Sequence, residues 1–135
     1  MTSKTAATYR RTLMAAATAA ITSIAFFQSG AAIAADAVQA RKDIKAMGME
    51  YGGQDFAKAA GNGDLTAVQL FLAAGMDVNE GGSAAIGLAA GRGKTEMVKF
   101  LLSKGSKATA NALQYARTRG YKDIEQILLA AGAKE

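Results

Sequence analysis

The chain has 135 residues, enough for one domain and a short appendage, and its formal net charge is +5. It contains no Cys and no His, which excludes disulfides, thiol nucleophiles, Ser–His triads and nearly all zinc or copper sites. The charge is unevenly distributed along the chain. Three basic residues and no acidic residue precede Asp36, whereas 13 basic and 11 acidic residues lie at or after it. A body so close to neutral gives little reason to expect a nucleic-acid partner, and we expect no metal and no cofactor.

The first 35 residues have the three parts of a secretory signal peptide. Residues 1–11 are polar and basic, and residues 13–27 are apolar apart from two Thr and one Ser. A small residue, an Ile and a small residue follow at positions 32–34. We therefore predict cleavage after Ala34 or Ala35, with a mature protein that is periplasmic or secreted.

An uncleaved membrane anchor is the alternative for the same segment. Leu13–Ala35 is long enough to span a bilayer, but it is rich in Ala and Thr and would make a weak anchor. Either interpretation places the remainder of the chain beyond the membrane.

Residues 36–47 predict a helix that ends at Gly48 and covers the first of the repeats that follow. Its apolar residues near one helical face are Val38, Ala40, Ile44 and Met47. We expect Met49 and Tyr51 to lie over the first repeat. Residues 36–53 are thus assigned as an N-terminal capping helix and linker.

Residues 54–135 contain one pattern three times. The copies start their shared motif at Phe56, Ile86 and Leu113, and they occupy about 54–82, 83–108 and 109–135. The matching columns are Ala59, Ala89 and Ala116; Gly63, Gly93 and Gly120; Leu72, Leu102 and Leu129; and Gly75, Gly105 and Gly132.

Each copy predicts two short helices joined by a turn. The first recurrent glycine suits a turn with positive φ, and the second suits the C-terminal cap of the second helix. Asp64 stands where a helix N-cap belongs, whereas the other copies have Lys94 and Tyr121 there. We therefore expect capping in those copies to be weaker, or to shift to Thr95. Because one such unit cannot bury its apolar face alone, we expect the three units to stack.

This pattern resembles the ankyrin repeat. The first copy matches through Ala59-Ala60, Gly63, Val68, Phe71-Leu72, Gly75 and Val78-Asn79, the second through Ala89-Ala90, Gly93, Val98, Leu101-Leu102 and Gly105, and the third through Ala112-Leu113, Tyr115-Ala116, Gly120, Leu128-Leu129 and Gly132. The resemblance implies an all-α, ankyrin-like solenoid of about three helix–turn–helix repeats with an N-terminal capping helix. It also implies a protein-binding module and not an enzyme.

The sequence departs from the family pattern in two ways. The Thr-Pro-Leu-His segment that opens each first helix of the family reads Ala84-Ala85-Ile86-Gly87 in the second copy, so we expect less rigid repeats. The connection from Gly105 to Asn111 is three residues shorter than the one from Gly75 to Ala84. We therefore expect one full β-finger over Met76–Ser83 and a clipped second finger.

The resemblance also implies a partner-binding surface on the finger tips and the adjacent face of the first helices. Carried over by position, this surface consists of Met76, Asp77, Asn79, Glu80, Ser83, Gly87, Ser106 and Lys107. The alternative is that these are ordinary solvated turn residues.

Basic residues gather in the second half of the stack. The predicted basic patch, at the turn between the two helices of a repeat, consists of Arg92, Lys94, Arg117, Arg119 and Lys122. We expect it to meet an acidic partner or an anionic membrane surface, the alternative being a solvated face.

These features together predict an exported module that binds a protein partner in the periplasm or cell envelope, as a monomer. An inhibitor or immunity-type protein that neutralises a toxin or an enzyme is one alternative. A membrane-tethered envelope scaffold is another, if the N-terminal segment is retained.

Overall fold

The structure of the protein, a computed structural model, describes residues 35–135. The predicted signal peptide lies outside the described residues, except for its last position. No helix in the described part of the chain is long and apolar enough to cross a membrane.

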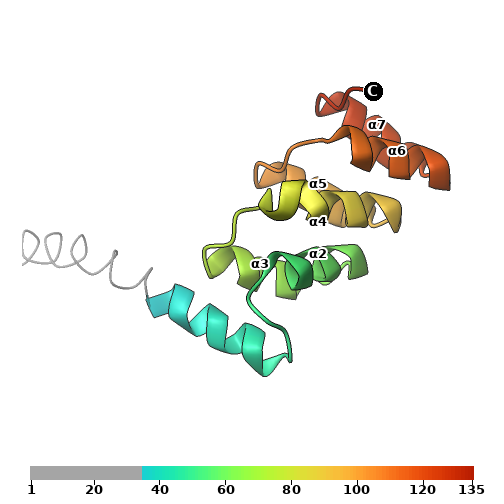
Figure 1. The fold of residues 1–135 in the computed structure, drawn as a ribbon. Coiled ribbons are helices and arrows are strands. Elements are labelled where there is room, and N and C mark those ends of the chain that lie inside the picture. The colour runs from blue at the N-terminus through green and yellow to red at the C-terminus, as the bar shows by residue number, and fades with distance from the viewer. Residues whose placement is uncertain (1–34) are drawn as a thin grey trace, which may run out of the picture. The chain divides into compact units, whose positions relative to one another are not determined.

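Helices joined by short connections make up residues 35–135, and this range contains no strand. A helix at residues 35–46 comes first, and the others are α2 (Gly53–Asn62), α3 (Leu65–Ala73), α4 (Glu80–Gly91), α5 (Thr95–Ser103), α6 (Ala110–Arg119) and α7 (Lys122–Ala130). Figure 1 shows α2 with α3, α4 with α5, and α6 with α7 as three successive layers. The first helices pack on one another, α2 on α4 and α4 on α6. The predicted all-α solenoid of three helical repeats is confirmed.

The turn inside each layer is fixed by backbone geometry and by one cap. Gly63, Gly93 and Gly120 have φ of 74°, 70° and 76°, the left-handed region that favours glycine. Asp64 accepts a hydrogen bond from the backbone N–H of Ala67 at 3.0 Å, which confirms the predicted N-cap. The corresponding residues of α5 and α7 make no side-chain cap bond, as expected.

The turn glycines are also places where consecutive layers touch. The aliphatic part of Lys94 lies on Gly63, and the ring of Tyr121 lies on Gly93. A Cβ added at Gly93 would stand 2.8 Å from Cζ of Tyr121, closer than real contacts allow. The repeat therefore needs glycine here for close approach as well as for positive φ.

The core is continuous through the three layers. The matching positions Phe56, Ile86 and Leu113 are buried in the first helices, and Phe71, Leu101 and Leu128 are buried in the second helices. Alanines fill the positions at which helices of adjacent layers approach most closely, since they add little bulk. Each layer thus covers the apolar face of the one before it.

The helix at residues 35–46 covers the first layer with a narrower face than the sequence predicts. Ala40 and Ile44 are buried, whereas Val38 and Met47, predicted to share their face, are exposed. Val38 lies about 120° or more around the helix from Ala40 and Ile44, and Met47 lies just beyond the last helical residue. Tyr51 completes the cover by stacking on a phenylalanine of α3, with its ring centroid 6.2 Å from that of Phe71.

The prediction of a β-finger over Met76–Ser83 is wrong. The segment forms a turn and then three consecutive left-handed residues, Gly81, Gly82 and Ser83, with φ of 64°, 69° and 65°. Two adjacent glycines make this left-handed turn accessible without steric cost, and it leads directly into the right-handed part of α4. Ser83 is held there by burial and by a 2.9 Å hydrogen bond from its Oγ to Oδ1 of Asn79.

Polar contacts between layers are unequal. Asn79 reaches the connection that follows the second layer, where its Nδ2 donates to the carbonyl of Gly105 at 3.2 Å and its Oδ1 accepts from the N–H of Lys107 at 2.8 Å. Arg92 donates to Oδ1 of Asn62 in the first layer at 2.7 Å. Arg92 therefore joins the second layer to the first, whereas Asn79 joins the connection before α4 to the connection after α5.

Candidate functional site: the inner face of the first helices

One face of the stack is formed by the first helices of the three layers, α2, α4 and α6. Corresponding positions on this face are occupied by Lys58, Leu88 and Tyr115, each of which precedes a buried alanine. Two hollows lie beside them and meet at Leu88, and together they are called the inner groove. The hollow between α2 and α4 has a volume of about 630 Å³ and is lined by Gly53, Gln54, Ala57, Lys58, Gly81, Ala84 and Leu88.

The hollow between α4 and α6 is smaller, about 250 Å³, and combines an aromatic ring with two cations. It is lined by Gly87, Leu88, Gly91, Arg92, Tyr115 and Arg119. Tyr115 packs on Gly87 and Gly91, and a Cβ at these positions would lie in ordinary van der Waals contact with the tyrosine side chain, at 3.8 Å and 3.5 Å. Tyr115 is nevertheless 51% exposed, a large aromatic side chain left open to a partner.

The two arginines of this hollow keep most of their hydrogen-bonding capacity. Arg92 is exposed and donates to the side chain of Asn62, which leaves its remaining N–H groups available. Arg119 is also exposed. Within residues 35–135 neither guanidinium forms an ion pair with a carboxylate. The hollow therefore presents uncompensated positive charge beside an apolar surface.

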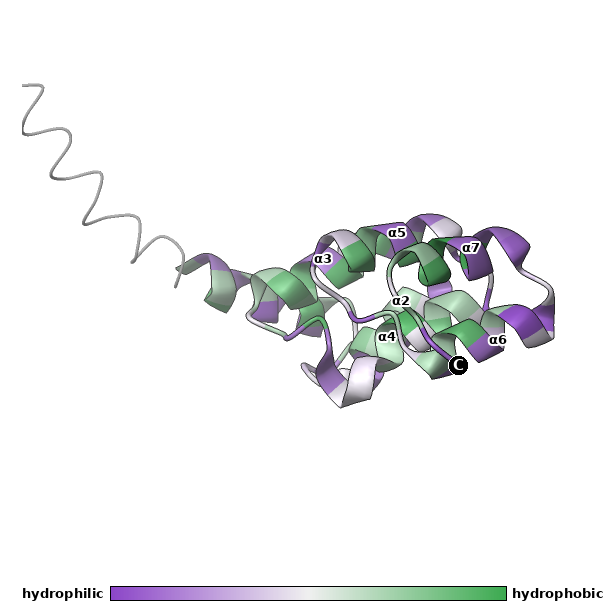
Figure 2. Ribbon diagram, turned by 90° about the horizontal axis from the view of Figure 1, so that it is seen from above, coloured by the Kyte–Doolittle hydropathy of each residue, from purple (hydrophilic) through white to green (hydrophobic). Residues whose placement is uncertain are grey.

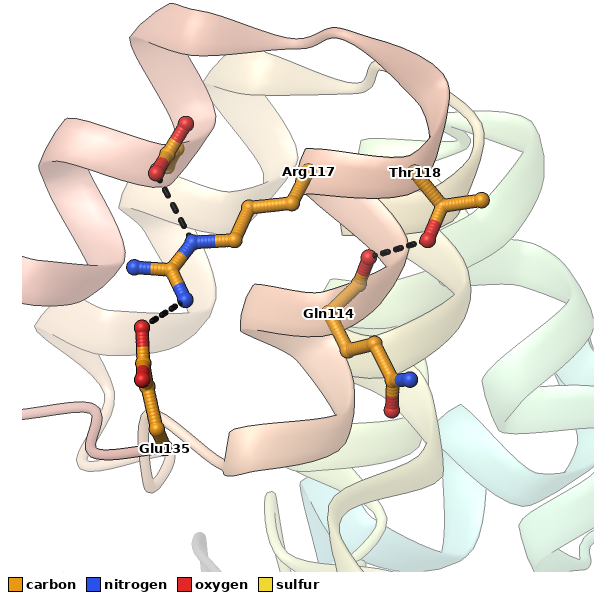
Figure 3. A network of polar contacts seen from close by, with 5 residues as sticks. Gln114, Arg117, Thr118 and Glu135 are labelled. Carbon is orange, nitrogen blue, oxygen red and sulfur yellow. Dashed lines mark hydrogen bonds and ion pairs between the residues drawn. The ribbon is translucent and has the colours of Figure 1, made fainter.

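Arg117 does not belong to the basic patch predicted for it. Its Nε donates to Glu125 at 2.8 Å, and its Nη1 bonds to Glu135 (Figure 3). These hydrogen bonds raise the pKa of the arginine further, the bond to Glu125 having the larger effect. The charge of Arg117 is thus compensated within the chain, and its side chain lies at the end of the stack.

The remaining two residues of the predicted patch lie apart from the inner groove. Lys94 lines a separate hollow of about 500 Å³ beside Leu65 and Met97, and its aliphatic part is used in packing on the first layer. Lys122 is the first residue of α7 and is exposed. Of the five basic residues, only Arg92 and Arg119 therefore share one hollow.

The finger residues predicted to bind a partner divide by burial. Asp77, Glu80 and Lys107 are exposed, and Met76 and Asn79 are half-buried. Ser83, Gly87 and Ser106 are buried, although Gly87 contributes to the floor of a hollow. Asn79 and Ser83 bond to each other and Asp77 bonds to the N–H of Asn79 at 2.8 Å, so these polar groups stabilise the connection.

Sequence reasoning missed Leu88 and Tyr115, two large side chains that line the groove. Each lies next to a buried alanine of a recurrent column, so the repeat pattern alone does not separate it from the core. A finer signal was present, since the matching position in the first copy is a lysine, and a column that accepts Lys, Leu and Tyr faces solvent.

Comparison with known proteins agrees with this geometry. A family model described as ankyrin repeats, three copies, matches residues 56–135. Myotrophin of Xenopus tropicalis is 45% identical over 58 residues, which cover 41% of this chain and 49% of myotrophin. The chain thus spans about half the length of this curated relative. No solved structure matches the chain.

The matched residues take in helices of all three layers. They include every residue that lines the inner groove except Gly53 and Gln54. Ankyrin repeats typically act by binding other proteins and not by catalysis. The chain belongs to the ankyrin-repeat family, and its repeats form a protein-binding module.

Proposed function

We propose that this protein binds a protein partner through the inner groove, outside the cytoplasm. The observation that carries the proposal is the hollow between α4 and α6, where an exposed Tyr115 shares the lining with Arg92 and Arg119, two arginines that have no carboxylate partner among residues 35–135. Exposed aromatic residues and arginines contribute most to protein–protein affinity when a partner desolvates them.

The location rests on the first 35 residues. A basic start, an apolar stretch and small residues at positions 32 and 34 favour export and cleavage. A retained segment would instead make the protein a membrane-tethered scaffold of the envelope. An inhibitor or immunity-type protein that covers a toxin or an enzyme would be a special case of the proposed binding.

Cell fractionation followed by N-terminal sequencing tests the location. We expect the protein in the envelope or periplasmic fraction, with a mature chain that starts at Ala35 or Asp36. A chain that retains residue 1 and stays in the membrane fraction would favour the tethered scaffold. A full-length chain in the cytoplasmic fraction would contradict export altogether.

Site-specific photocrosslinking tests the binding face. A photoreactive amino acid at Tyr115 should crosslink to a partner in cells, because this side chain is exposed in the groove. Gln69, exposed on α3 away from the lining residues of the groove, serves as the matched control position. Crosslinking from Gln69 but not from Tyr115 would exclude the inner groove as the binding face.

A further inference from the structure

We propose that the inner groove binds an acidic segment of its partner, one in which carboxylate side chains flank an apolar or aromatic residue. The apolar residue would lie against Tyr115 in the α4–α6 hollow, and the carboxylates would pair with Arg92 and Arg119. This inference rests on the proposed function and specifies the chemistry of the partner.

The apolar half of the site follows from the floor of the hollow. The side chain of Tyr115 lies over Gly87 and Gly91, so the base of the hollow consists of α4 backbone covered in part by an aromatic ring. Leu88 and Tyr115 form walls on either side, and both are apolar over most of their surface. A hollow of about 250 Å³ is large enough for one bulky side chain and too small for a folded element.

The charged half follows from the balance of ion pairs. Three acidic groups of the second and third layers are engaged, because Glu96 pairs with Lys99 at 3.1 Å and both Glu125 and Glu135 pair with Arg117. Glu80 and Asp123 form no ion pair within residues 35–135, and neither lines this hollow. Arg92 and Arg119 can therefore pair with carboxylates of a bound partner. Charge complementarity therefore favours an acidic partner.

The geometry of the arginines favours carboxylates held on a peptide. Asn62 holds one edge of the Arg92 guanidinium, which positions the remaining donors for a bidentate carboxylate. The arginines line a hollow together with an aromatic ring, so a ligand must supply an apolar group and anionic groups at short spacing. A flat layer of lipid headgroups supplies only the second of these.

Selection of peptides from an unbiased random library tests this chemistry with the full-length protein as bait. We expect the selected peptides to combine Asp or Glu with an adjacent Leu, Phe or Trp. The Arg92→Glu/Arg119→Glu variant should no longer select acidic peptides. Lys42→Glu/Lys45→Glu is the matched control, because it changes the net charge equally at exposed positions of the first helix and should select the same peptides as the wild type.

Affinity measurements on a selected peptide give the size of the effect. Reversal of both arginines should weaken binding about tenfold or more, and higher ionic strength should reduce the difference. Tyr115→Ala should also weaken binding, without changing the salt dependence. Thermal unfolding of each variant serves to exclude misfolding as the cause.

Other results would overturn the inference. Selected peptides without acidic residues, or no selection at all, would contradict the acidic chemistry. Binding to phosphatidylglycerol vesicles that requires both arginines, in place of peptide binding, would assign the site to a membrane surface. Crosslinking from Tyr115 to a protein partner would still support the proposed function in these cases, so the two failures are distinguishable.

Discussion

At the scale of single residues, the turn glycines show how the repeat controls the distance between layers. Gly93 and Gly120 occupy the same column and have nearly the same φ, 70° and 76°. They differ in their surroundings, because Tyr121 of the third layer lies on Gly93 and nothing lies within 4 Å of the Cβ position of Gly120. An alanine at Gly120 would lose stability through backbone conformation alone, whereas an alanine at Gly93 would also overlap the tyrosine ring.

Gly93→Ala should therefore destabilise the protein more than Gly120→Ala. The left-handed conformation alone costs about 1–2 kcal/mol for alanine, and overlap with the Tyr121 ring at Gly93 should add about 1–3 kcal/mol. Chemical denaturation of the two variants measures the difference. Equal losses of stability would show that the tyrosine ring moves aside freely.

Asp55 links the linker to the first helix and is expected to make stability depend on acid. The backbone N–H of Glu50, which donates at 2.8 Å, lowers the pKa of Asp55, and the side chain of Lys58 lowers it further. The folded state therefore favours the ionised carboxylate. Its contribution is full above the ordinary carboxyl pKa and is lost as the pH falls through the depressed value.

Comparison of Asp55→Asn with the wild type across pH tests this linkage. The variant should be less stable near neutral pH, and the difference should shrink in acid as the wild-type carboxylate becomes protonated. Asp123→Asn, at an exposed position without an ion pair, serves as control and should change stability little. A pH-independent difference would assign the role of Asp55 to packing and not to charge.

At the scale of elements, sequence reasoning succeeded where a repeated pattern carried the signal. Paired helices, positive-φ turns and the Asp64 cap follow from spacing and from local chemistry. The finger was wrong because its expectation came from a family average, and the consecutive glycines Gly81 and Gly82 favour a left-handed turn instead. Val38, which was predicted to lie on the buried face of the first helix, is exposed. Periodicity does not show how wide the contact between a helix and its neighbours is.

The last layer ends in a charged cluster where the earlier layers are apolar. Arg117 stands in the column of the buried Ala60 and Ala90, and Glu125 stands in the column of the buried Val68 and Val98. Figure 2 shows hydrophilic residues gathered on the outer turns of α6 and α7, whereas α4 is mostly on the hydrophobic side of the scale. An additional layer stacked here would have to bury these charges.

Replacing Arg117 and Glu125 by the apolar residues of the earlier copies should therefore make the end of the stack prone to self-association. Arg117→Ala/Glu125→Val replaces an ion pair by an apolar surface like those that join the layers, so we expect concentration-dependent self-association. Sedimentation velocity measures it. Glu96→Val/Lys99→Ala removes an ion pair from α5 outside this end and should leave the oligomeric state unchanged. A variant that remains monomeric at high concentration would refute this role of the cluster.

At the scale of the whole molecule, fold class was accessible from the sequence and the binding groove was only partly so. Self-comparison of the chain gives the number of layers, because each column repeats in register. Which exposed residues share a hollow depends on how far side chains reach across layers. Arg92 and Arg119 were predicted together because they occupy one column, whereas Arg117 was misplaced since its partners Glu125 and Glu135 come from elsewhere in the chain.

The uneven bonding between layers has a mechanical consequence. Arg92 of the second layer donates to Asn62 of the first, so a side-chain hydrogen bond joins these two layers at their turns. Among residues 35–135 no side-chain hydrogen bond ties the second layer to the third, where apolar packing and the Tyr121 contact with Gly93 hold the junction. We expect the junction that lacks a side-chain hydrogen bond to open more easily than the other. Tyr115 and Arg119 both belong to the third layer, so a tilt of that layer would change their distance from Arg92 in the second layer.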